Sequence, residues 1–187
     1  MPYKEESKKA RRRAIRYLVY RDRSRNEIIC YLKGKKFSAN AVDETLAFLE
    51  DNGYVNDQRF ALQFGRSRIE NKKVGRLRLE RELRNKGLER QLIDETLSSL
   101  YKEYDEREIA MSCAKKKLSS SSPNDSKKER GRLARFLERK GFPTGIVYQV
   151  VTHLIQHVSN NDLAPLSRSP GENPRKLDSL AIRINQG

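Results

Sequence analysis

Residues 79–97 read LERELRNKGLERQLIDETL, and this stretch predicts two short helices joined by a tight turn. Leu79 and Leu83 are four residues apart and therefore share one helix face, and the apolar residues after Gly87 recur at helical intervals too. A glycine adopts the left-handed conformation that ends a helix without steric cost, and Lys86 before it complements the negative helix end. The stretch predicts a helix–turn–helix with one apolar stripe on each helix.

The same spacing occurs three times along the chain without gaps. Leu79 has one counterpart 51 residues earlier, Ile28, and another 54 residues later, Leu133. The tetrapeptide DETL also occurs twice, ending at Leu46 and at Leu97. An amphipathic segment precedes each copy, at residues 10–20, 57–72 and 105–118. We therefore expect an all-α fold of tandem three-helix repeats, three units forming an elongated, curved array.

The expected boundaries follow this repeat. A basic N-terminal extension covers residues 1–9, and the three units cover residues 10–55, 56–104 and 105–158. A serine-rich loop interrupts the third unit at residues 119–126, and a polar tail at residues 159–187 is expected to be disordered.

The signals at the helix ends differ between the units. Ser24 and Glu27 have the spacing of a capping box, which predicts that a helix begins after Ser24. The third unit repeats the Lys-Gly turn with Gly141, whereas the first has Lys36 at the glycine position. We expect the turn at Lys36 to be less regular, because side chains other than glycine rarely adopt the left-handed conformation.

Basic and acidic residues alternate in step with the repeat. The chain has 40 Lys and Arg against 25 Asp and Glu, a formal net charge of +15, yet residues 37–56 and 91–111 are each net acidic. Basic patches at regular intervals favour a periodic polyanionic partner, with nucleic acid first, over ordinary solvated helix faces. Aromatic residues are sparse among the basic ones, which favours sequence-tolerant contact with a nucleic-acid backbone over stacking on bases.

The sequence predicts a protein that is not an enzyme, because no motif of a catalytic site or phosphate-binding loop occurs. No cofactor or metal is expected: His153 and His157 are four residues apart, but no carboxylate or cysteine clusters beside them. Cys113 continues an apolar stripe and is expected to be buried, whereas Cys30 is expected to be partly exposed, with reactivity a secondary hypothesis.

The sequence also predicts a cytoplasmic monomer without a membrane partner. No apolar run approaches the roughly 20 residues needed to cross a bilayer, and the basic N-terminus lacks the apolar stretch of a signal peptide. Two cysteines without a CxxC motif do not form a disulfide framework and suit a reducing compartment.

The middle unit resembles the RecX family of regulatory proteins. The resemblance rests on three motifs at specific spacing, Gly-Tyr-x-x-Asp, Arg-Phe-Ala and Lys-Gly-Leu, and it covers about residues 10–157. Lys36 and the serine-rich insertion depart from the family pattern. The motif residues are interpreted as mainly structural; they are Gly53, Tyr54, Asp57, Arg59, Phe60, Ala61, Arg68, Gly75, Leu79, Leu83, Lys86 and Gly87.

The resemblance implies a modulator of the recombinase RecA in DNA repair and the SOS response. It implies binding in the groove of the RecA–DNA filament, with inhibition of ATP hydrolysis, strand exchange and filament growth as the expected effect. Two alternatives remain open: a general nucleic-acid-binding helical module, and a basic helical scaffold for an acidic protein. From the charge pattern we expect RecA and single- or double-stranded DNA to contact Arg11, Arg12, Arg13, Arg21, Arg23, Lys72, Lys73, Arg76, Arg78 and Arg84.

Overall fold

The computed structural model describes residues 2–119 and 126–161, and these two ranges contain nine α-helices and no strand. The helices are α1 (Pro2–Leu18), α2 (Arg25–Gly34), α3 (Ala39–Asp51), α4 (Asp57–Lys72), α5 (Arg76–Asn85), α6 (Arg90–Glu103), α7 (Glu106–Leu118), α8 (Ser126–Lys140) and α9 (Thr144–Asn161). Every helix pair with extensive contact belongs to one of three consecutive three-helix units. The predicted all-α class and tandem repeat are confirmed.

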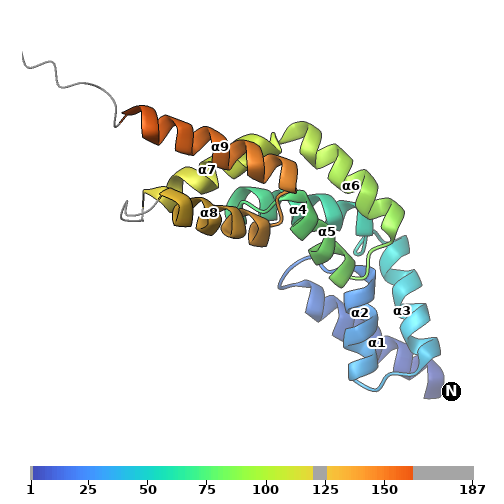
Figure 1. The fold of residues 1–187 in the computed structure, drawn as a ribbon. Helices are drawn as coiled ribbons and strands as arrows, with labels where there is room; N and C mark the ends of the chain where they lie inside the picture. The colour runs from blue at the N-terminus through green and yellow to red at the C-terminus, as the bar shows by residue number, and fades with distance from the viewer. Residues whose placement is uncertain (1, 120–125, 162–187) are drawn as a thin grey trace, which may run out of the picture.

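The three units follow one another along a bent path (Figure 1). Helices α3 and α6 run along the outer side of the bend, whereas α2, α5 and α8 follow one another on the opposite side. In each unit the third helix packs against both of the others. The second helices therefore form a row on one side of the array, and the third helices cover the other.

The apolar core is divided in two. The first unit closes around its own cluster, which includes Ile28, Leu32, Leu46 and Leu49, each at most 1 % exposed. A second, larger cluster runs through the second and third units without a break, from Phe60 on α4 to residues of α9. The first unit is therefore a separate apolar body, and its connection to the rest is mainly polar.

Several local expectations can be compared with the structure. Ser24 and Glu27 form the predicted capping box, and α4 has the predicted bounds. Gly87 and Gly141 adopt positive φ angles of 75° and 87°, and Lys36 adopts the same conformation at 62° despite its side chain. The first turn therefore has the same backbone conformation as the other two, and its irregularity is the strain of a lysine at the glycine position.

Two boundaries differ from the expectation. Residues 2–9 are not a separate extension; they form the first turns of α1. These turns contact the start of α3, because the Glu6 carboxylate accepts hydrogen bonds from the amide of its N-cap residue Ser38 at 2.9 Å and from the Ser38 hydroxyl at 2.8 Å. Helix α9 continues to Asn161, three residues beyond the expected end of the third unit. Residues 120–125 of the serine-rich loop and residues 162–187 of the tail lie outside the described residues.

Adjacent units are joined at the N-terminus of the earlier unit's second helix. At the first joint, the Arg25 amide donates to the Asp57 carboxylate at 2.7 Å, and the Ser24 hydroxyl donates to the Lys86 carbonyl at 2.6 Å. Asp57 is the first residue of α4, and Lys86 lies in the turn between α5 and α6. An acidic group stabilises a helix N-terminus because the amides there lack partners within the helix.

The second joint repeats this geometry. The Arg76 amide donates to the Glu106 carboxylate at 2.6 Å, and the Gly75 amide donates to the Lys140 carbonyl at 2.9 Å. Glu106 begins α7 as Asp57 begins α4, and Lys140 precedes the glycine of its turn as Lys86 does. The Lys-Gly turns therefore end a helix and also clasp the preceding unit.

Candidate partner-binding surface

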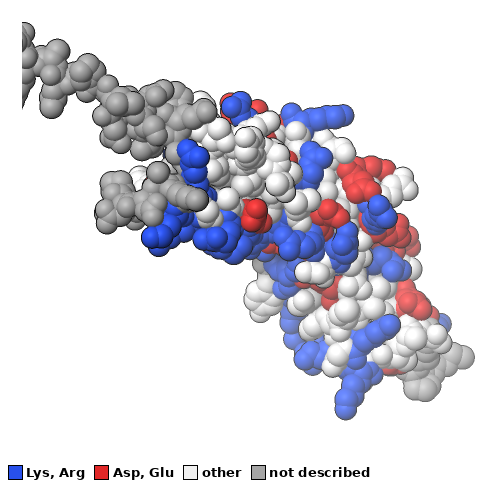
Figure 2. All heavy atoms as spheres, viewed as in Figure 1, with Lys and Arg blue, Asp and Glu red and all other residues white. Residues whose placement is uncertain are grey.

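Charge is divided between the two sides of the array. Helix α3 has four acidic residues and no basic one, whereas α8 has seven basic residues and two acidic ones. Figure 2 shows Lys and Arg gathered along the side formed by α8 and α5, and Asp and Glu gathered over the outer side near α6. The alternation of charge along the sequence thus becomes a separation of charge between two sides of the molecule.

The second helices present equivalent residues at the centre of their exposed faces. Leu79 and Leu83 of α5 face the core, so Arg81 lies on the opposite side of that helix and is exposed. Arg135 occupies the same position on α8 and Cys30 the same position on α2, and both are exposed. Arg81 and Arg135 were not among the residues expected to bind a partner. The repeat offsets could have found them, because they place both arginines opposite the apolar stripe.

Five of the expected binding residues have side chains available to a partner: Arg12 and Arg13 on α1, Lys72 and Lys73 at the end of α4, and Arg84 on α5, all of them exposed. The Arg84 side chain, 63 % exposed, forms an ion pair with Glu80 one turn earlier. Exposed pairs of this kind contribute about 0–1 kcal/mol, so a phosphate group could displace Glu80 at little cost.

Three others take part in packing. The Arg11 guanidinium lies 4.6 Å from the centre of the Phe48 ring, and that of Arg23 lies 4.0 Å from the centre of the Tyr17 ring. Arg76 belongs to the second joint, where its side chain approaches Glu106 at 3.6 Å. These arginines act first as parts of the fold, because their charge is used within the chain.

Arg78 and Arg21 are ion-paired within the chain as well. Arg78 contacts Glu82 on the next turn of α5 at 2.9 Å. Arg21 binds both carboxylate oxygens of Glu27, and the Lys86 ammonium approaches the same carboxylate at 2.8 Å. Desolvation by itself raises the pKa of Glu27, but the hydrogen bonds from Arg21, Lys86 and the Ser24 amide lower it to about 2. Glu27 is therefore an ionised link across the first joint.

Two tyrosines near the N-terminal arginines do not offer free ring faces. Tyr17 and Tyr31 stack in parallel with their ring centres 4.0 Å apart. Arg23 covers the Tyr17 ring, and the Lys35 ammonium lies 5.8 Å from the centre of the Tyr31 ring. A nucleobase could stack on this pair only by displacing a cation, which favours contact with phosphates over contact with bases.

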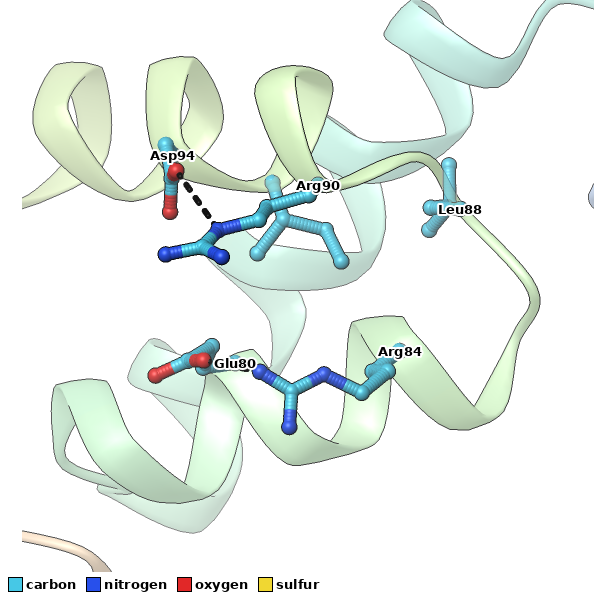
Figure 3. A pocket seen from close by; sticks show the side chains of 6 residues that line it. Glu80, Arg84, Leu88, Arg90 and Asp94 are labelled. Atoms are coloured by element: carbon cyan, nitrogen blue, oxygen red, sulfur yellow. Dashed lines mark hydrogen bonds and ion pairs between the residues drawn. The ribbon is translucent and has the colours of Figure 1, made fainter.

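A shallow hollow of about 320 Å³ lies between α5 and α6. Figure 3 shows Arg90 reaching Asp94 across one turn of α6, and Arg84 extending along α5 beside Glu80. Each rim charge thus has an opposite charge next to it, and the apolar floor is small. Across the described part of the chain, no three His, Cys, Asp or Glu residues come together as metal ligands. The hollow offers no convergent set of groups for chemistry on a small molecule.

The two cysteines lie in different surroundings. Cys113 is buried, as predicted, and its thiol contacts the Lys73 carbonyl at 3.6 Å. Desolvation raises the pKa of the Cys113 thiol and so disfavours the reactive thiolate. Cys30 is exposed, also as predicted, on the outward face of α2. None of the described helices is long and apolar enough to cross a membrane.

Comparisons with known proteins identify all three units. Family models described as the first, second and third three-helix domains of RecX match residues 10–49, 56–97 and 104–151. The regulatory protein RecX of Chlorobium phaeobacteroides is 36 % identical over 151 residues, covering 81 % of this chain and 97 % of its own length. That of Streptomyces lividans is 33 % identical over 155 residues, covering 83 % and 82 %. The crystal structure of RecX from Lactobacillus salivarius has the same fold, with a TM-score of 0.69 at 22 % identity, over 80 % of this chain and 97 % of that one.

Proposed function

Because the chain belongs to the RecX family of regulatory proteins, we propose that it modulates RecA by binding along the groove of the RecA–DNA filament. The expected effect is inhibition of ATP hydrolysis, strand exchange and filament growth. The observation that supports this proposal best is the row of second helices, which carries basic side chains along one side of a bent array while acidic side chains collect on the other.

This arrangement suits a long, periodic polyanion. Each exposed cation near a phosphate releases condensed counterions, so binding strengthens as more contacts form and weakens as salt is added. Contacts made by one unit raise the effective concentration of the next, so three weak sites on one chain bind tightly together. Contacts directed at phosphates also explain how one protein could bind a filament on any DNA sequence.

Arg81 and Arg135 are the residues on which this proposal depends most. Both are exposed at equivalent positions of the row, and the Arg81 side chain donates a hydrogen bond to the Leu77 carbonyl of its own helix at 3.2 Å. Arg12, Arg13, Lys72, Lys73 and Arg84 are proposed as further contacts. Arg11, Arg23 and Arg76 are poor targets for a binding test, because their loss would disturb packing.

The test is the DNA-stimulated ATPase of RecA at sub-stoichiometric amounts of this protein. The wild-type chain should inhibit the ATPase. The double variant Arg81→Gln with Arg135→Gln should need about 10-fold more protein for the same effect, because it loses two phosphate contacts. The same loss should reduce the salt dependence of binding. The control is Lys102→Gln on α6 with Arg107→Gln on α7, which removes the same charge from exposed positions off the row of second helices and should behave as wild type.

The outcomes separate the proposal from its alternatives. If the protein binds naked DNA tightly but leaves the ATPase unchanged, it is a general nucleic-acid-binding module. If both double variants lose activity equally, net charge matters and the row of second helices does not. Circular dichroism melts of all variants should coincide with that of the wild type, because the substituted side chains are exposed.

A further inference from the structure

An exposed apolar group lies at the C-terminal end of α1. Ile15 is 38 % exposed, Val19 77 % and Tyr20 82 %, so half of the six exposed large hydrophobic residues in the described part of the chain lie within six positions of one another. The backbone amide of Val19 donates to the Ile15 carbonyl at 3.2 Å, so Val19 continues the helical path one turn beyond Ile15. Ile15 and Val19 therefore share one face, and Tyr20 follows Val19 in the turn after α1. Exposed apolar side chains are common singly, but neighbouring ones are typical of an interface.

The fold does not require apolar residues at these positions. The core-facing residues Ala10, Ala14 and Leu18 of α1 correspond to Ala61, Gly65 and Ile69 of α4 and to Ala110, Ala114 and Leu118 of α7. By this alignment, Ile15 corresponds to Arg66 and Lys115, and Val19 corresponds to Glu70 and Ser119. Two other units of the same architecture therefore use polar residues where the first unit exposes an isoleucine and a valine.

The neighbours of this group indicate what it would bind. Arg12 lies three residues before Ile15, and Arg16 lies three residues before Val19. Both arginines are exposed and therefore lie beside the apolar residues on the same face of α1. The face therefore combines an apolar tip with a basic border. Its complement is an apolar pocket with an acidic rim, which a protein surface can provide and a DNA backbone cannot.

We propose that Ile15, Val19 and Tyr20 form an anchor that docks into an apolar, acid-rimmed pocket on the protein component of the filament. This inference rests on the proposed function and assigns its two kinds of contact to different places: the row of second helices to phosphate, and the tip of α1 to protein. Tyrosine is among the residues that contribute most at protein interfaces, because it buries a large rigid surface at low entropic cost.

The experiment uses the full chain with Val19→Ser and Tyr20→Ser, and Tyr148→Ser as the control. Tyr148 is also highly exposed, at 71 %, but lies on α9, and none of the three substitutions changes the charge. Affinity is measured by biolayer interferometry for RecA without DNA, for the RecA–DNA filament and for naked DNA. The double variant should bind RecA in both forms about 10- to 30-fold more weakly, with unchanged binding to DNA.

Several results would overturn the inference. Equal affinity of the double variant and the wild type for RecA would do so, and so would weaker binding to naked DNA, which would mean that Tyr20 stacks on bases. The same holds if the substitutions abolish self-association in sedimentation velocity or abolish binding to anionic phosphatidylserine vesicles, because a second copy or a membrane would then be the occupant. If the wild-type chain binds neither RecA nor its filament, the proposed function fails and this inference with it. If the wild type binds and the variant binds equally well, only this inference fails.

Discussion

Replacing Gly141 with alanine should disrupt the joint between the second and third units. Gly141 has φ +87°, so any side chain there carries the strain of the left-handed conformation, about 1–2 kcal/mol. The added Cβ would also overlap the backbone nitrogen and Cβ of Arg78, which cannot move aside as the end of a flexible side chain can. Two hydrogen bonds across this joint depend on that close approach, from the Gly75 amide to the Lys140 carbonyl and from the Leu77 amide to the Gly141 carbonyl.

The magnitude follows from these contributions. Loss of the two hydrogen bonds, at about 1 kcal/mol each, adds to the conformational strain and gives a destabilisation of about 3–4 kcal/mol. For a chain of this size that corresponds to a decrease in Tm of roughly 10 °C. The assay is urea unfolding followed by circular dichroism, with calorimetry for the Tm.

A matched control distinguishes strain from steric overlap. Gly53 also has positive φ, at +68°, but a Cβ added there meets no atom within 4 Å. Gly53→Ala should therefore cost only the strain, about 1–2 kcal/mol. If Gly141→Ala destabilises the chain no more than Gly53→Ala does, the close contact between the Lys-Gly turn and α5 does not hold these units together.

Two further predictions concern the first unit and its joint. Lys36→Gly should raise the free energy of unfolding by about 1 kcal/mol, because glycine removes the strain at φ 62°, and an unchanged urea midpoint would show that this strain is absent. Glu27, with its pKa lowered to about 2, stabilises the folded state above pH 4.5, and this contribution is lost as pH falls toward 2. Glu27→Gln should therefore cost up to roughly 3 kcal/mol at pH 7 and much less near pH 2, and a cost that is the same at both values would contradict an ionic role.

The spacing of apolar residues was sufficient to predict the helices and their grouping. Periodicity is a local property, and it is strong here because each helix carries one narrow apolar stripe, such as Leu79 with Leu83. The end of α4 after Lys72 and the turn at Gly87 were predictable for the same reason, since local residues determine them.

The binding surface was harder to predict, because its residues depend on partners far away in the sequence. The charge pattern predicted that Arg76 would bind a partner. In the structure its amide and its side chain both contact Glu106, 30 residues later in the chain, at the second joint. Arg23 was expected to bind a partner, yet it covers the ring of Tyr17. A charge count gives the number of cations in a segment, but only the packing shows which of them face outward, as Arg81 and Arg135 do.

The joints have a direction, and this direction bears on how the chain folds as it is made. In each joint the later unit supplies the carboxylate and the Lys-Gly turn, while the earlier unit offers hydrogen-bond donors at the N-terminus of its second helix, which precedes the later unit in the chain. A unit leaving the ribosome therefore finds its docking site already formed, so assembly can proceed from the N-terminus without waiting for distant residues. The turn of the first unit has a lysine at position 36 where the turns of the later units, which form the two joints, have glycine.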